Sequence, residues 1–122
     1  MSSRAERIRD VLRSLKQATP DVLGSAVVSS DGLIIASLLP EEIDEELVSA
    51  MAAAMLGVGE RISAELMSAK MEQTYVQSDR GFVVVNSVGA ESAFVVLTTK
   101  DAKLGLMLMD VRRRSAELEE IV

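Results

Sequence analysis

Acidic side chains are the first group in this 122-residue chain that could do chemistry. Five carboxylates fall within residues 41–46: Glu41, Glu42, Asp44, Glu45 and Glu46. Carboxylate oxygens suit Ca²⁺ or Mg²⁺, but no histidine and no second oxygen-ligand cluster at coordinating spacing accompanies them. Negative charge is also favourable in the first turn of a helix, at the positive end of the helix dipole. We therefore predict a helix start here and no metal site.

Catalytic groups are otherwise scarce. The chain contains no histidine and no cysteine, so its serines have no obvious partner base and we expect no catalytic nucleophile. It has no Gly-x-x-x-x-Gly-Lys-Ser/Thr loop, so we do not expect it to bind GTP itself. Asp31-Gly32 is typical of a tight turn. These residues predict a protein that is not an enzyme and holds no cofactor.

Two basic features allow a functional and a structural interpretation. Arg80, in a predicted turn, is the type of residue that can act in trans as an arginine finger, although a solvated turn arginine is far more common. Residues 112–114 are three consecutive arginines that could meet an acidic partner or anionic lipid. Membrane attraction usually takes about 4–8 basic residues, so we favour a solvated helix end.

Composition narrows the class of protein. A hydrophobic content of 48% predicts a buried core, and the net charge of −6 argues against nucleic-acid binding, which needs clustered Lys and Arg. No apolar run approaches the ~20 residues of a membrane span. The N-terminus is charged, unlike a signal peptide. We expect a cytoplasmic protein in which residues 1–122 form a single domain.

A long helix is predicted over residues 44–69, and it carries two apolar stripes. The first recurs at steps of three or four and should face the core; it comprises Leu47, Met51, Ala54, Met55, Val58, Ile62 and Leu66. The second comprises Val48, Ala52, Leu56, Gly59 and Ser63, which are small or apolar where a solvated helix would carry Lys and Glu. We expect the second stripe to pack on another molecule.

The remaining segments predict an α+β fold. Helices are expected over residues 3–18 and 102–121, a hairpin over 24–38, and three further strands at 71–78, 82–88 and 92–98. The order α-β-β-α-β-β-β-α predicts one five-stranded antiparallel sheet, with the long middle helix on one face and the terminal helices on the other. Strand 71–78 is polar and should be an unprotected edge strand.

This element order, with the residues that fill it, resembles the Roadblock/dynein light-chain family. Residues 28–36 (VSSDGLIIA) look like the family's first hairpin, residues 51–57 (MAAAMLG) like its middle helix, and residues 102–106 (AKLGL) like the entry to its last helix. The resemblance implies a homodimer in which the third strand pairs antiparallel with its copy and the two middle helices lie side by side.

The unprotected edge and the second stripe independently favour such a dimer, because one two-fold axis could satisfy both. The predicted dimer contacts are Val48, Ala52, Leu56, Gly59, Ser63, Glu72, Thr74 and Val76.

The resemblance further implies a regulator of small Ras-like GTPases, as in the bacterial gliding-motility polarity system, so we expect a bacterial protein. The GTPase would bind the paired middle helices and be stimulated without donation of a catalytic residue. Small residues at helical spacing predict its contact surface: Ser49, Ala53, Gly57, Glu60 and Ala64. The same residues could instead pack on the twin helix. Two alternatives stay open: a structural adaptor that binds regardless of nucleotide, and a small-ligand-sensing domain.

Overall fold

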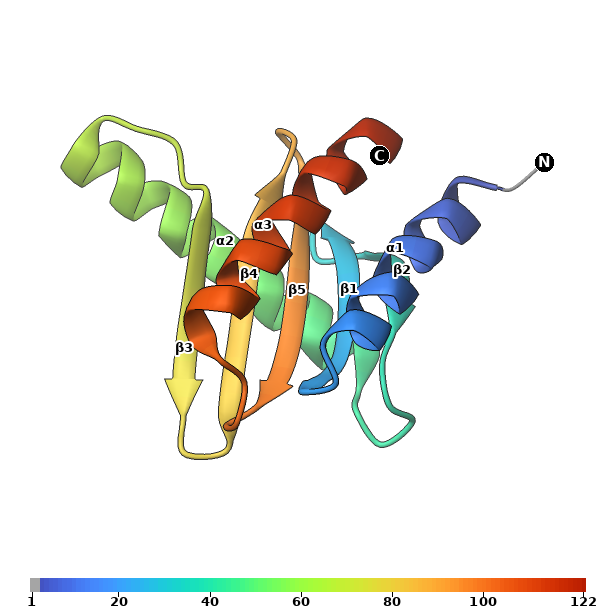
Figure 1. Cartoon of the computed structure of the whole chain (residues 1–122). Coiled ribbons are helices and arrows are strands. Elements are labelled where there is room, and N and C mark those ends of the chain that lie inside the picture. Colours follow the sequence, from blue (N-terminus) through green and yellow to red (C-terminus); the bar gives the residue numbers. More distant parts are fainter. Residues whose placement is uncertain (1–2) are drawn as a thin grey trace.

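The fold consists of eight elements in the predicted order. It was obtained as a computed structural model and is described for residues 3–122 (Figure 1). The elements are α1 (Arg4–Ala18), β1 (Val22–Ser29), β2 (Ile34–Leu38), α2 (Glu45–Met67), β3 (Gln73–Ser78), β4 (Gly81–Val88), β5 (Ser92–Thr99) and α3 (Leu104–Ile121).

The five strands form one antiparallel sheet in the order β2-β1-β5-β4-β3. β5 lies in the middle, flanked by β1 and β4, and these three apolar strands are buried on both faces. β3 is an edge strand, as its polar sequence predicts, and β2 forms the opposite edge.

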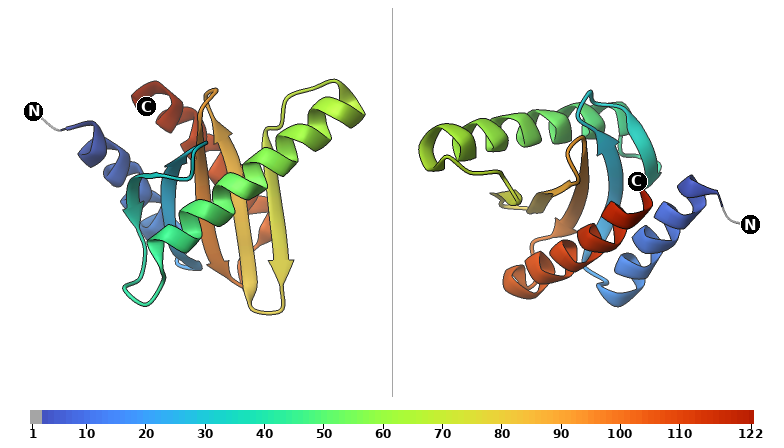
Figure 2. Two further views of the ribbon diagram at one scale, coloured as in Figure 1. Left: turned by 180° about the vertical axis from the view of Figure 1, so that it is seen from behind. Right: turned by 90° about the horizontal axis from the view of Figure 1, so that it is seen from above.

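The helices cover the sheet as predicted, with α1 and α3 on one face and α2 alone on the other (Figures 1 and 2). The larger core lies under α1 and α3 and includes Ile8, Leu12, Phe94, Met107 and Leu118. The smaller core, under α2, consists mainly of small aliphatic side chains: Ala26, Val28, Ala52, Leu56, Met71, Val85, Ala93 and Val95. The α+β fold with the long middle helix alone on one face is therefore confirmed.

Local signals place the starts of two helices. The Ser3 hydroxyl accepts a hydrogen bond from the Glu6 amide at 3.1 Å, and the Asp44 carboxylate accepts bonds from the Glu46 and Leu47 amides at 2.9 and 3.3 Å. Both are N-cap contacts, which satisfy amides that have no partner inside the helix. The acidic segment before α2 is therefore the predicted helix start.

α2 is longer than the sheet is wide. It crosses the sheet obliquely from the β1–β2 side and extends beyond β3, so that its C-terminal part projects past the sheet edge (Figure 2). By length and composition alone α2 is long and apolar enough to cross a membrane, and the expectation of no membrane span stays a prediction. Three residues of α2 are buried in the fold, namely Ser49, Ala52 and Leu56.

Gly81 begins β4 directly after the Asp79–Arg80 turn, and the chain has no room for a side chain there. A Cβ at this position would lie 1.9 Å from the backbone oxygen of Thr98. Because that oxygen belongs to the central strand, it cannot move aside. We expect Gly81→Ala to lower the free energy of unfolding by about 3 kcal/mol or more, measured by urea denaturation.

Gly105 provides the matched control for this substitution, because a Cβ there meets no atom within 4 Å. Gly105→Ala should leave stability unchanged or raise it by up to about 1 kcal/mol, since alanine favours the helix. Equal stability of the two variants would contradict the close approach of β4 to β5 at Gly81.

Candidate protein-binding interface

The two apolar stripes of α2 are placed the opposite way from the sequence prediction. Ala52 and Leu56 of the second stripe are 1% and 2% exposed and pack on the chain's own sheet. The assignment of Ala52 and Leu56 to the dimer interface is therefore corrected, because these residues cover the sheet. Val48 is half-buried against the same core, and its contact with a second molecule stays a prediction.

Small side chains explain why the second stripe, and not the first, faces the sheet. Gly59 lies so close to the segment before β3 that a Cβ would come within 2.2 Å of the Met71 Sδ. Together with Ala52 it lets the helix backbone approach the sheet closely, which the long side chains of the first stripe would prevent. Ser63, one turn further on, is half-buried. Whether Gly59 or Ser63 also touches a second molecule stays a prediction.

The first stripe, predicted to be core, is largely exposed. We call five of its members the apolar stripe: Leu47, Met51, Val58, Ile62 and Leu66, which are between 53% and 75% exposed. Met55 is half-buried and packs on the smaller core, and Ala54 is exposed. Scattered exposed apolar residues are normal, but a stripe of this length along one helix marks an interaction surface.

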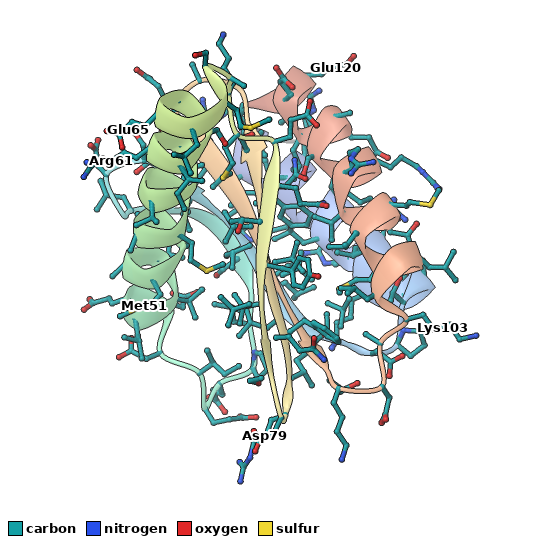
Figure 3. The ribbon with its side chains drawn as sticks, turned by 90° about the vertical axis from the view of Figure 1, so that its left-hand side faces the viewer. Met51, Arg61, Glu65, Asp79, Lys103 and Glu120 are labelled. Atoms are coloured by element: carbon teal, nitrogen blue, oxygen red, sulfur yellow. The ribbon has the colours of Figure 1, made fainter. Side chains whose placement is uncertain are left out.

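The direction in which the apolar stripe faces follows from helix geometry. Residues nine positions apart lie about two and a half turns apart, on opposite sides of a helix. Ala53 lies beside Gly32 in the β1–β2 turn, at 3.9 Å from the position that a Cβ would take there. Ile62 must therefore point the other way, toward the end of the sheet that carries the β3–β4 turn. Figure 3 shows the helix from the β3 edge, with Arg61 and Glu65 pointing away from the sheet.

Below the apolar stripe, the α2 face of the sheet is incompletely covered. Val76 of β3, Val83 of β4 and Leu97 of β5 are direct cross-strand neighbours, and we call them the lower row. Val76 is 52% exposed, whereas Val83 and Leu97 are half-buried at the margin of the smaller core. The apolar stripe and the lower row thus leave apolar surface exposed on α2 and on the α2 face of the sheet beside β3, and we call this surface the apolar patch.

The two sheet edges differ in how well they are protected. β2 is five residues long, its pairing with β1 is interrupted by a bulge, and Pro40 follows it. Bulges, prolines and short strands are the usual protection against strand addition. β3 pairs with β4 in unbroken register over all six residues and has neither a bulge nor a proline. β3 is therefore the edge that can accept another strand.

The predicted GTPase surface is partly available. Ser49 is 3% exposed, with its hydroxyl donating to the Glu46 carbonyl at 3.0 Å, so its assignment to that surface is corrected. Ala53 is half-buried beside the β1–β2 turn. Gly57, Glu60 and Ala64 are exposed, and we call them the outer platform. Glu60 and Ala64 also border a hollow of about 630 Å³ that reaches Gly89 and Ala90.

The basic residues singled out in the sequence do not converge on one site. Arg80 is exposed in the β3–β4 turn. On α3, Arg113 lies 3.7 Å from Asp110, and Arg114 lies 3.8 Å from Glu117 and donates to the Ser14 hydroxyl at 2.8 Å. These contacts support the structural interpretation of the arginine run.

Three groups of interface candidates were missed wholly or in part by the sequence prediction. The apolar stripe was assigned to the core, only Val76 of the lower row was named as a dimer contact, and the odd-numbered residues of β3 were not named among the dimer contacts. One signal was present: the largest side chains of α2 concentrate on one stripe and the smallest on the other. Small residues on a helix that crosses a sheet favour the sheet-facing side.

Comparison with known proteins identifies the class to which this fold belongs. The Roadblock/LC7 domain model matches residues 8–98. Three uncharacterized proteins of Methanocaldococcus jannaschii are 40%, 40% and 41% identical to the chain over 101 residues, which is 83% of this chain and 85–88% of each relative. The chain therefore belongs to the Roadblock/LC7 family. These relatives are archaeal and do not support the expectation of a bacterial source, which stays a prediction.

Solved structures share the whole arrangement. The gliding protein MglB of Thermus thermophilus superimposes with a TM-score of 0.88 at 18% identity, over 99% of this chain and 92% of that one. MglB of Myxococcus xanthus gives 0.85 at 18% identity, with 94% of both chains covered. A Roadblock/LC7 domain from Streptomyces avermitilis gives 0.83 at 16% identity, over 90% and 92%. At these identities the similarity establishes the fold.

Proposed function

We propose that this protein is a non-catalytic homodimer that regulates a small Ras-like GTPase in the cytoplasm. The observation that carries the proposal is the apolar patch: exposed apolar side chains on α2 and on β3 lie beside the unprotected sheet edge. An isologous dimer across that edge would cover both surfaces at once.

The proposed two-fold axis stands perpendicular to the sheet, beside β3. Rotation about this axis makes the two β3 strands antiparallel and keeps both α2 helices on the same face of the joined sheets. The part of α2 that projects past β3 then lies over the partner's sheet (Figure 2). The partner's α2 lies in the same way over the lower row, beside the apolar stripe.

Burial of apolar area supplies the driving force. Fully burying one Val, Leu, Ile or Met side chain contributes about 1.5–3 kcal/mol. The apolar stripe contributes five such side chains from each copy, and each is already more than half exposed in the single chain. Burying the whole exposed part of these ten side chains would contribute about 8–20 kcal/mol, which is comparable with the cost of association in lost translational and rotational freedom, about 4–15 kcal/mol.

The GTPase would dock on the solvent side of the helix pair, where the outer platform lies. At Gly57 a Cβ would meet nothing within 4 Å, so this part of the helix surface is open and flat. Arg80, the candidate arginine finger, lies in the β3–β4 turn and not on the outer platform. Stimulation of hydrolysis would then come from rigid docking that orders the partner's own catalytic loop, without donation of a group.

The test is a binding and hydrolysis experiment with a Ras-like GTPase from the same organism. We expect the purified dimer to bind the GTPase loaded with a non-hydrolysable GTP analogue at least tenfold more tightly than the GDP form, measured by calorimetry, and to raise its hydrolysis rate. Equal binding of both forms with no change in rate would replace this proposal with a nucleotide-independent adaptor.

A further inference from the structure

The open side of β3 carries backbone amides and carbonyls that determine how a second copy of this strand can pair with it. The Ser87 amide donates to the Glu72 carbonyl at 2.9 Å, and Ser78 faces Gly81 across the two-residue turn. In an antiparallel pair, hydrogen-bonded positions alternate along the strand. Glu72, Thr74, Val76 and Ser78 therefore direct their backbone groups to β4. The open edge is left with the amides and carbonyls of Gln73, Tyr75 and Gln77.

Two-fold symmetry restricts how these groups can pair. If residue i of one copy faces residue j of the other, then j also faces i, and both must come from the open-edge set. The register is named by its centre, the residue beside the two-fold axis. With Thr74 or Val76 at the centre, only two open-edge residues of each copy face open-edge residues of the other copy. With Tyr75 at the centre all three do, since Tyr75 faces Tyr75 and Gln73 faces Gln77.

We propose that the second copy joins β3 in the register centred on Tyr75. This inference rests on the proposed homodimer and specifies which atoms of the two copies meet. Pairing of all three open-edge residues leaves no backbone group of the joined β3 strands without a partner at the centre of the interface, where water is excluded.

Side chains are compatible with this register on both faces of the sheet. Gln73 Nε2 donates to Asn86 Oδ1 at 2.9 Å and to the Leu108 carbonyl at 3.0 Å. In this register Gln73 faces the partner's Gln77, whose side-chain carboxamide can donate to the Gln73 Oε1. Tyr75, in edge-to-face contact with Phe82 at 6.3 Å, meets its own copy on the α3 face. On the α2 face, Thr74 faces Val76 of the other copy, a favourable β-branched pair.

Charge does not oppose this self-pairing. Residues 73–78 contain no charged side chain, so the two copies of β3 bring no like charges together. Inward-pointing lysines, which native edge strands use against self-pairing, are absent from the same residues.

Single cysteines test the register, because the chain has none of its own. Thr74→Cys, Tyr75→Cys and Val76→Cys are oxidised separately with copper phenanthroline at low protein concentration, and disulfide-linked dimer is followed on non-reducing gels. Facing positions have Cα atoms about 5.5 Å apart, within disulfide range, whereas positions displaced by two residues lie about 7–8 Å apart. We expect the position-75 variant to cross-link at least tenfold faster than the other two.

A mixture of two single-cysteine variants tests the same register with Tyr75 unchanged. Gln73→Cys and Gln77→Cys should cross-link when mixed, and each alone should not, because residue 73 faces residue 77. Fastest cross-linking at position 74 or 76 would overturn the Tyr75 centre. A dimer by light scattering that cross-links at none of the five positions would overturn strand pairing while leaving the homodimer standing. A monomer by light scattering would instead refute the homodimer itself.

Discussion

Ile62→Glu should convert the dimer into a folded monomer. Ile62 lies in the middle of the C-terminal half of the apolar stripe and is 53% exposed in the single chain, so the fold does not depend on it. In an isologous interface the substitution occurs twice. Losing two isoleucine burials and placing two carboxylates in the apolar patch should cost about 4 kcal/mol or more, which weakens association about 1,000-fold. Analytical ultracentrifugation across a dilution series measures the change.

Ala50→Glu is the matched control on the same helix. Ala50 is exposed and lies outside the apolar stripe, so the new carboxylate stays in water. We expect this variant to remain dimeric, with unchanged circular dichroism in both variants. If Ile62→Glu and Ala50→Glu sediment alike as dimers, the apolar stripe is not the dimer interface, and the apolar patch needs another partner.

Gly57→Arg should abolish GTPase binding while the dimer persists. The position is exposed and its surroundings are open, so arginine fits the free protein without a clash. Its long side chain would stand between the outer platform and a docked partner. Loss of close contact at the centre of an interface typically costs 2 kcal/mol or more, so affinity should fall about 30-fold or further. Calorimetric titration with the GTP-loaded GTPase gives the affinity.

Two control variants separate the effect of side-chain size at residue 57 from the effect of an added arginine elsewhere on the protein. Gly57→Ala adds one methyl group in open space and should retain GTPase binding, with a gain in helix stability of up to about 1 kcal/mol. Ala116→Arg introduces the same charge on α3, on the opposite face of the sheet, and should bind normally. Normal binding by Gly57→Arg would place the GTPase surface elsewhere on the dimer.

Sequence patterns predicted the framework because they report local physics. The period of the apolar residues distinguished helices from strands, Ser3 and Asp44 marked helix starts by their capping ability, and Asp31-Gly32 marked a hairpin turn. The polar composition of residues 71–78 identified the edge strand. Each of these features depends on neighbours within a few positions along the chain.

The candidate interface was predicted at the level of elements but only in part at the level of residues. α2 and β3 were chosen correctly as the elements that each keep one open side, since the apolar stripe and the β3 edge are both exposed. Ala52 and Leu56 were nevertheless assigned outward and Ile62 inward. Periodicity shows that a helix has two apolar stripes, but it carries no information about which one meets the sheet.

The sequence alone therefore determined the element order, the layered fold, the family resemblance and the presence of an unprotected edge. Only the tertiary structure decided which stripe of α2 is buried, where the apolar patch lies and which groups of β3 remain unpaired. The physical reason is that those features depend on how closely two elements approach in space. Contacts such as Gly59 on Met71 set that approach, and they join residues that no local pattern connects.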